Sequence, residues 1–312
     1  MTYVTVSNIE KRYDTQPVLQ QINFTIEKGE RFGLIGPNGA GKSTLIDIMT
    51  GLKKADKGNV MIDGKSIRQH AILIREKLGV VPQELALIEE LNAIDNLSYF
   101  GGMYGLSGKL LKERIDEVLH AAGLYEKRKD KVKTYSGGMK RRLNIVASLL
   151  HKPEFLILDE PTVGVDPQSR QHIFDFLMKL NAEGMTILYI SHYMEEVEAL
   201  CDRLLVLDLG KEVAYGTKSD VKSLVSRVNK VTLTLDRLPQ QIAEQLIASE
   251  NGIQQVETHM TTLHLLVNQY EFSMMKLIAF FDKTESVIKS ISVDELSLEE
   301  VFLQLTGKKL RD

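Results

Sequence analysis

A glycine-rich segment between an apolar strand and a helix constrains this chain most. Gly36-Pro37-Asn38-Gly39-Ala40-Gly41-Lys42-Ser43-Thr44 follows the apolar run Arg31–Ile35 and leads into the helical spacing of Lys42–Met49. It fits the pattern G-x-x-x-x-G-K-[ST], in which glycines let successive backbone N–H groups turn inward around phosphate oxygens. The helix start adds the positive end of its dipole. A strand, a phosphate loop and a helix in this order predict an α/β fold of the P-loop NTPase class.

Two side chains of this loop have further predicted roles. Lys42 brings a full positive charge for the β- and γ-phosphates of a nucleotide, and Ser43 offers its hydroxyl to Mg²⁺. The predicted nucleotide-binding residues of the segment are Gly36, Asn38, Gly39, Gly41, Lys42, Ser43 and Thr44.

An acidic pair follows a second buried strand. Four apolar residues, Phe155–Leu158, precede Asp159 and Glu160, and ligands of open α/β sheets gather at the carboxyl ends of the strands. Asp159 is predicted to reach Mg²⁺ through water, and Glu160 to orient or deprotonate an attacking water. An acidic pair alone is equally typical of a helix cap. Together with the phosphate loop, it favours nucleotide hydrolysis.

The first two-thirds of the chain alternates between strands and helices. Further strands are predicted at Val18–Ile26, Thr186–Ile190 and Leu204–Leu207. Helices are predicted at Asp166–Leu180 and Tyr193–Leu200. This order indicates a mostly parallel sheet with both faces covered. Between residues 84 and 151 the strand pattern is absent, and the helical spacing at Asn92–Met103, Ser107–Ala121 and Met139–Leu150 predicts a helical insertion.

Composition limits the function classes. The 312 residues suggest about two domains. The 39 basic residues against 42 acidic ones give a net charge of −3, which argues against a surface built for nucleic acid. The basic cluster at Lys127–Lys133 is more typical of a solvated surface than of a nucleic-acid patch. The single Cys201 cannot form an internal disulfide, and no apolar run approaches the roughly 18 residues of a membrane helix.

The pattern changes after about residue 228, where a small α+β domain is predicted to run to residue 312. Its expected order, β-α-β-β-α-β, is that of a split, ferredoxin-like fold. These elements are predicted at Val231–Leu235, Gln240–Ala248, Gln254–Thr258, Leu263–Val267, Phe272–Phe281 and Val287–Ile291. A last helix carries a capping box at Ser297 and Glu300, and Gly307 is where we expect it to stop.

A second glycine-rich segment, Tyr135–Arg142, also opens a helix. Ser136, Gly137 and Gly138 are small residues at a helix N-terminus, which makes another anion site. Two such helix starts in one chain indicate that a phosphate is held from two sides, by one chain or by two.

On these motifs residues 1–220 resemble the ATP-binding cassette (ABC) ATPases. Ser136-Gly137-Gly138 matches the family signature, although Tyr135 and Met139 replace its commonest Leu and Gln. The resemblance implies that the nucleotide is ATP. It also implies that Gln83 joins the metal site to the helical insertion and acts in catalysis.

Three more roles come from the resemblance alone. It implies that Tyr13 stacks on adenine, that His192 contacts the γ-phosphate, and that Asp166 lies in a loop that crosses to a partner cassette. In that loop Val163 stands where a Ser is more usual, so a hydroxyl contact is lost.

The family architecture implies two cassettes packed head to tail, as a homodimer or with a second cassette subunit. The segments 135–144, 162–170, 191–195 and 296–307 resemble the ATPase subunits of drug-resistance and antibiotic exporters. In that group the cassette lies on the cytoplasmic face of the membrane and binds a separate permease, here through the region Gln83–Met103. The alternatives are an importer-type cassette and an ABC ATPase that acts on ribosomes or DNA.

Overall fold

Six short strands form the central sheet of the first part of the chain. The order is β10 (Lys211–Thr217), β9 (Arg203–Asp208), β3 (Arg31–Ile35), β8 (Thr186–Ser191), β7 (Phe155–Asp159) and β6 (Leu78–Val81). Five strands run parallel and β10 pairs antiparallel to β9. The sheet is therefore mostly parallel, as predicted. The computed structural model describes residues 1–225, 228–239, 241–249, 251–284, 286–294 and 296–306.

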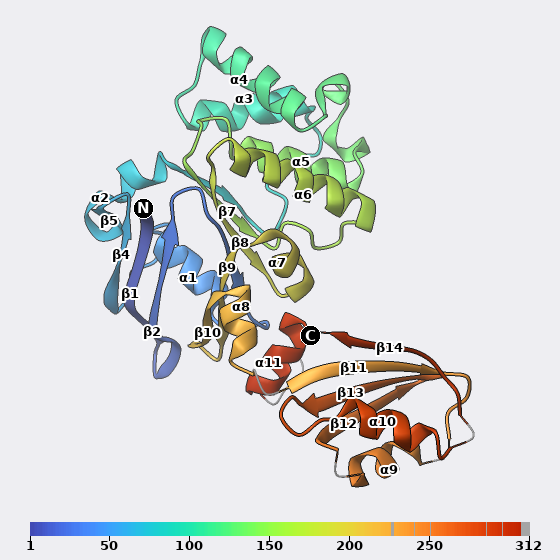
Figure 1. The fold of residues 1–312 in the computed structure, drawn as a ribbon. Coiled ribbons are helices and arrows are strands. Elements are labelled where there is room, and N and C mark those ends of the chain that lie inside the picture. Colours follow the sequence, from blue (N-terminus) through green and yellow to red (C-terminus); the bar gives the residue numbers. More distant parts are fainter. Residues whose placement is uncertain (226–227, 240, 250, 285, 295, 307–312) are drawn as a thin grey trace. The chain divides into compact units, whose positions relative to one another are not determined.

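The chain divides into two units, Met1–Lys218 and a second one that begins at Ser219 (Figure 1). The first unit has another sheet, antiparallel, in the order β2 (Gln16–Glu27), β1 (Thr2–Tyr13), β4 (Lys57–Ile62) and β5 (Lys65–Ser66). Residues of both sheets share one buried core with α1 (Lys42–Met49) and α2 (Ile67–Arg75). The phosphate loop thus begins from a strand and ends in a helix that are both anchored in this core.

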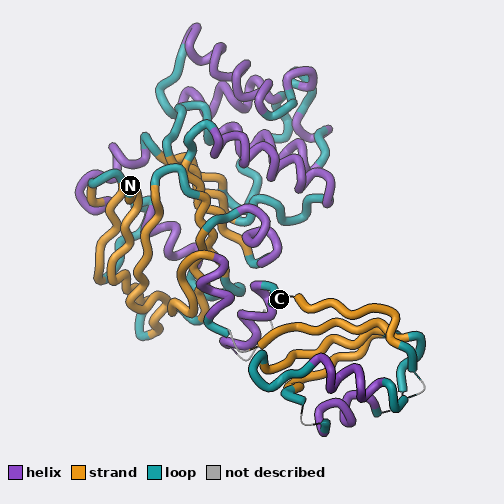
Figure 2. The backbone as a smooth tube through the Cα atoms, viewed as in Figure 1, coloured by secondary structure: helices purple, strands orange, loops and turns teal. Residues whose placement is uncertain are grey.

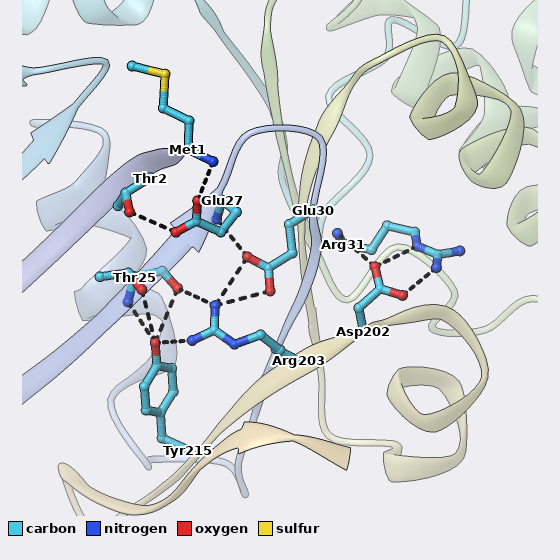
Figure 3. Close-up of polar contacts among 9 residues, drawn as sticks. All are labelled: Met1, Thr2, Thr25, Glu27, Glu30, Arg31, Asp202, Arg203 and Tyr215. Carbon is cyan, nitrogen blue, oxygen red and sulfur yellow. Dashed lines mark hydrogen bonds and ion pairs between the residues drawn. The ribbon is translucent and has the colours of Figure 1, made fainter. Parts of the chain in front are cut away.

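A polar network connects the antiparallel sheet to the central sheet (Figure 3). Arg203 at the start of β9 donates to Glu30 Oε1 at 3.3 Å and to the carbonyl of Thr25 on β2 at 3.4 Å. The backbone N–H of Thr25 donates in turn to the hydroxyl of Tyr215 on β10, at 3.1 Å. The packing between the two sheets is therefore specified by directional bonds as well as by apolar burial.

Within its described residues, the predicted insertion contains helices and no β-strand, apart from one isolated bridge between Asn92 and Lys131. Between residues 84 and 151, all of which are described, the structure has α3 (Ala93–Met103), α4 (Gly108–Ala121) and α5 (Gly137–Ala147), with short 3₁₀ turns at Tyr125–Lys127 and Val132–Thr134. The helices α6 (Pro167–Ala182) and α7 (Met194–Leu200) follow β7 and β8. Among the described residues, no helix is both long and apolar enough to span a bilayer.

The second unit begins near α8 (Lys218–Ser223) and contains a four-stranded antiparallel sheet. Its order is β12 (Ile253–His259), β13 (Thr262–Asn268), β11 (Val228–Leu235) and β14 (Ile288–Asp294). The helices α9 (Ile242–Ala248) and α10 (Met274–Phe281) share the buried core of this sheet and lie on one of its faces (Figure 2). The element order along the chain is therefore β-α-β-β-α-β.

The last helix, α11 (Leu298–Thr306), begins with the predicted capping box. The N–H of Ser297 donates to Glu300 Oε2 at 2.8 Å, and the N–H of Glu300 donates to Ser297 Oγ at 3.3 Å. The predicted stop at Gly307 and the predicted helix start at Gln240 lie outside the described residues.

Candidate active site

The phosphate loop is held in shape by close backbone contacts. Gly39 and Gly41 have φ of +81° and +105°, in the left-handed region that favours glycine. A Cβ on Gly36 would lie 2.3 Å from the carbonyl oxygen of Leu207, and one on Gly41 would lie 2.8 Å from Leu19 Cδ2. The loop therefore requires glycine at Gly36 for space, at Gly39 for conformation and at Gly41 for both, while Asn38 and Gly39 are exposed.

Lys42 lies over this loop and is 6% exposed. Its Nζ donates to the carbonyls of Gly36, at 2.7 Å, and Pro37, at 3.3 Å. Burial lowers the pKa of Lys42, against the opposing effect of the nearby Glu160 and Asp159 charges. The ammonium is thus held where phosphate oxygens would enter the loop.

The predicted acidic pair lies at the carboxyl end of β7. Glu160 is 5% exposed and has a φ of +47°, and its N–H donates to the carbonyl of Ile190 at 2.9 Å. Burial, with the Glu160 charge as the next cause, raises the pKa of Asp159 to about 6. Two acids are therefore kept close together in a poorly solvated place, at a cost in free energy that a bound cation would offset.

Three predicted residues converge on the carboxylate of Glu160, itself a predicted residue. Gln83 Nε2 donates to Oε2 at 2.9 Å. On the other oxygen, Lys42 Nζ lies 3.7 Å from Oε1. His192 Nδ1 lies 3.0 Å from Oε1, although outside hydrogen-bond geometry. The structure thus brings together residues that are up to about a hundred positions apart in the sequence.

Tyr13 lies next to the phosphate loop at the end of β1. Its ring is 40% exposed, with Lys11 Nζ and Lys53 Nζ at 5.6 Å and 5.5 Å from its centroid. Hydrogen bonds from Lys53 and from Thr44 lower the pKa of the Tyr13 hydroxyl. An exposed aromatic face is therefore presented beside Thr44. Ser43, in the first turn of α1, is also exposed.

The second glycine-rich segment forms a separate group with the start of α6. Ser136 caps α5 by accepting from the N–H of Met139 at 3.3 Å, and Asp166 caps α6 by accepting from the N–H of Ser169 at 2.9 Å. A Cβ on Gly138 would lie 2.4 Å from Ser169, so the two helix starts are in contact there. A Cβ on Gly137 would have its nearest neighbouring atom 3.8 Å away. Ser136 and Gly137 are exposed and free to face another molecule.

Arg141 connects these two groups and was not predicted. It is 5% exposed, and its guanidinium donates to the carbonyl of Gln83 at 2.8 Å and to the carbonyl of Val163 at 3.4 Å. A charged residue in a helix is usually exposed to solvent, so the sequence pattern does not predict that Arg141 is buried. The one indication of burial in the sequence is that Arg141 lies between the glycines of Tyr135–Arg142 and the apolar Leu143.

Comparison with known proteins agrees with this geometry. The family model described as ABC transporter matches residues 19–163. The linearmycin resistance ATP-binding protein LnrL of Bacillus subtilis is 44% identical over 98% of this chain and 98% of its own length. The daunorubicin resistance ATP-binding protein DrrA3 of Streptomyces coeruleorubidus is 33% identical over 99% and 98%. The Nod factor export ATP-binding protein I of Ralstonia nicotianae is 35% identical over 99% and 95%.

Solved structures match a large part of the chain. The ADP conformation of MJ1267, an ATP-binding cassette of an ABC transporter, is 28% identical, with a TM-score of 0.65 over 72% of this chain and 95% of that one. The dimeric post-hydrolysis state of the cassette MJ0796, bound to ADP and Pi, is 28% identical, with a TM-score of 0.62 over 69% and 98%. These findings confirm the family and the P-loop cassette fold predicted from the motifs. The chain belongs to the ABC transporter family, as an ATP-binding and ATP-hydrolysing subunit.

Proposed function

We propose that this subunit powers the export of drugs, antibiotics or other hydrophobic compounds through a separate permease. The observation that carries the catalytic part is the convergence of Gln83, Lys42 and His192 on the buried Glu160 carboxylate. In this proposal Glu160 accepts the proton of the attacking water, and Gln83 and His192 hold that water and the γ-phosphate in line. Lys42 leaves its two carbonyl acceptors and binds the β- and γ-phosphates.

We propose Mg²⁺ as the accompanying cation. Ser43 offers a hydroxyl oxygen, Asp159 a carboxylate and Gln83, which contacts Glu160, an amide oxygen. Mg²⁺ takes hard oxygen ligands while keeping waters and substrate phosphates. The raised pKa of Asp159 supports this assignment, because a nearby cation would favour its charged form. When bound, the ion would neutralise charge on the phosphates.

Two copies of the cassette complete the proposed site. The Gly36–Thr44 loop binds the phosphates of ATP and Tyr13 stacks on its adenine. Ser136, Gly137 and Gly138 of a second cassette cover the same nucleotide, and Asp166 lies in the loop that crosses between the copies. The exposed positions of Ser136, Gly137 and Asp166 at two touching helix starts support this arrangement, and the cassette MJ0796 was solved as a dimer.

The permease is proposed to dock on an apolar groove of the helical insertion. A groove of about 340 Å³ is lined mainly by Val80, Pro82, Ala86, Phe100, Met103 and Tyr104. Met103 is 69% exposed and Tyr104 44%, and apolar side chains exposed around a hollow are typical of interaction sites. We place the subunit on the cytoplasmic face of the membrane accordingly, without a nucleic-acid partner. In the basic cluster, Lys127 pairs with Asp130 at 3.3 Å and Lys133 with Glu90 at 3.1 Å.

The proposed class of exported compounds is based on the similar proteins. Two of those compared are described as resistance proteins for linearmycin and daunorubicin, and a third as a Nod factor exporter. We propose a cassette at residues 1–220, whose helical subdomain is at about 84–151, and an accessory domain at 228–312 that stabilises the dimer.

Affinity purification from solubilised membranes tests this function. We expect a multi-spanning protein to co-purify with the wild type and to be lost with Met103→Asp, which places a charge in the groove. Met260→Asp is the matched control, since Met260 is also exposed, at 84%, and lies in the second unit. Recovery of ribosomes in place of a membrane protein would refute the proposal, as would unchanged recovery with Met103→Asp.

A further inference from the structure

The carboxylate of Glu196 is buried at 2% exposure in α7, four residues after His192. A buried carboxylate is costly unless hydrogen bonds and a cation compensate it. Three hydroxyl groups donate to it: Thr162 at 2.8 Å, Tyr189 at 2.9 Å and Ser191 at 3.0 Å. Arg170 Nε lies 3.4 Å from Oε1 as an ion pair. So many partners around one buried acid indicate that its position is strongly determined.

One side of this cluster holds the backbone on both sides of His192. Ser191 Oγ donates to Glu196 and also accepts from the N–H of Tyr193 at 2.9 Å. The peptide units that flank His192 are therefore tied to the acid through a single hydroxyl. Close packing fixes α7 itself, because a Cβ on Gly33 of β3 would lie only 2.3 Å from Val197 Cγ1.

The other side of the cluster holds the turn that follows Glu160. Thr162 Oγ1 is 2.8 Å from both carboxylate oxygens of Glu196. Tyr189 lies on β8, the strand that pairs with β7. Its hydroxyl keeps its proton, because burial and the Glu196 charge raise its pKa well above its ordinary value. Glu196 is therefore bound to the residue before His192 and to the second residue after Glu160.

We infer that Glu196 is a positioning residue that holds His192 opposite Glu160 through Ser191 and Thr162. This inference rests on the proposed function, because it concerns the roles proposed there for Glu160 and His192. Glu196 does not touch the reacting groups in this scheme. Its carboxylate sets the distance between the histidine and the turn that carries the base.

A double-mutant comparison tests the inference. We expect Glu196→Gln to lower kcat roughly 10- to 100-fold, the usual effect of losing a group that orients a functional side chain, with ATP affinity changed by less than about twofold. In a His192→Ala background, measured in single-turnover experiments, the same substitution should lower the rate by no more than about twofold, since the residue it positions is gone. Glu195→Gln, an exposed neighbour in the same helix, is the matched control.

The outcomes separate this inference from the proposed function. If His192→Ala alone leaves the wild-type rate, the role proposed for His192 is wrong. Suppose that His192→Ala lowers the rate, and that Glu196→Gln in that background lowers it by the same factor as in the wild type. The positioning role is then wrong. Equal losses of ATP affinity and turnover would indicate a structural role only.

A spectroscopic readout covers the case in which Glu196→Gln folds poorly. Ser191→Ala leaves the acid with Thr162 and Tyr189 but frees the backbone beside His192. The chain has seven histidines, and the His192→Ala spectrum identifies the ring Hε1 signal of His192. We expect Ser191→Ala to shift that signal and to lower kcat, whereas Glu195→Gln should do neither. An unmoved signal together with unchanged turnover would overturn the inference.

Discussion

At the residue scale, the buried groups around Glu160 carry opposite charges that depend on one another. Lys42 and Glu160 are 6% and 5% exposed and lie 3.7 Å apart, so each reduces the cost of burying the other. Asp159 adds a second acid, and burial, followed by the charge of Glu160, raises its pKa to about 6. A substitution that removes one of these charges therefore leaves a buried partner uncompensated.

Glu160→Gln changes the charge and keeps the shape. The amide cannot take a proton from water, so we expect hydrolysis to fall by on the order of 10²–10³-fold, as for the loss of one preorganised catalytic group. ATP binding should persist, and ATP-bound dimers should accumulate because the bridging phosphate is no longer removed. Phosphate release and size-exclusion chromatography with ATP measure the two effects. Glu126→Gln, an exposed acid, is the control, and a wild-type rate in Glu160→Gln would contradict the assigned role.

At the scale of elements, Arg203 joins strands of both sheets in the first unit (Figure 3). Removing it leaves Glu30, which is 9% exposed, without the guanidinium that lies 3.3 Å away. We expect Arg203→Ala to lower the free energy of unfolding by about 1–3 kcal/mol, because the buried carboxylate loses its charged partner and keeps only the N–H of Glu27, which donates to Oε2 at 2.6 Å. Urea unfolding measures this loss. The exposed Lys129→Ala should cost far less, and equal effects of the two substitutions would show that the network adds nothing to stability.

His151, just after α5, gives the fold a predicted sensitivity to acid. Its Nε2 lies 2.9 Å from the carbonyl oxygen of Leu78 in β6, and burial lowers the pKa of its ring. The unfolded chain therefore binds a proton near the ordinary pKa of about 6.5, before the folded chain does, so stability falls as the pH drops below that value. His151→Gln keeps a donor and removes the titration. Its unfolding free energy should fall less than that of the wild type between about pH 7 and about pH 5.

The matched substitution for this pH series is His259→Gln, at an exposed site in the second unit. It should follow the wild-type curve. If His151→Gln followed the wild-type curve as well, the buried ring would not be the source of the acid sensitivity.

Elements with one dominant apolar pattern were predicted from the sequence, and irregular ones were not. β3, β7 and α1 are each a single buried run after or before a clear turn. β1 was missed because register shifts interrupt its alternation, for example between Val6 and Ile9. α2 was missed because His70 inside it has non-helical angles, φ −126° and ψ 31°. β6 has only four residues, too few for a periodic pattern.

The candidate site divides in the same way. Lys42, Asp159 and Glu160 belong to short motifs whose chemistry is readable from residue type and spacing. Gln83 and His192 were expected only through the family resemblance, since no local pattern shows that either lies beside Glu160. Arg141 and Glu196 were missed because a buried charge in a helix has the same sequence pattern as a solvated one. Only their partners, up to about sixty residues away, distinguish them.

At the scale of the whole molecule, the proposed dimer predicts that Gly137→Asp blocks association and spares the monomer. An added Cβ at Gly137 has its nearest neighbour 3.8 Å away, so the fold accommodates it. The carboxylate would face the phosphates held by the other copy and repel them. In a Glu160→Gln background, where dimers accumulate, we expect ATP binding to remain and the dimer peak to disappear. Gly102→Asp, at another helical glycine with open space, is the control.

Mixing two defective variants tests the head-to-tail order itself. Lys42→Ala removes the cation of the phosphate loop. Gly137→Asp places a negative charge in the segment that covers the partner's nucleotide. In a head-to-tail pair of the two, one site combines the intact loop of the Gly137→Asp copy with the intact cover of the Lys42→Ala copy, while the other site has both defects. The mixture should therefore recover ATP-dependent dimers with one nucleotide tightly bound, although neither variant dimerises alone. If each copy instead closed its own glycine segments over its own nucleotide, no mixture could restore a complete site, and the composite arrangement would be wrong.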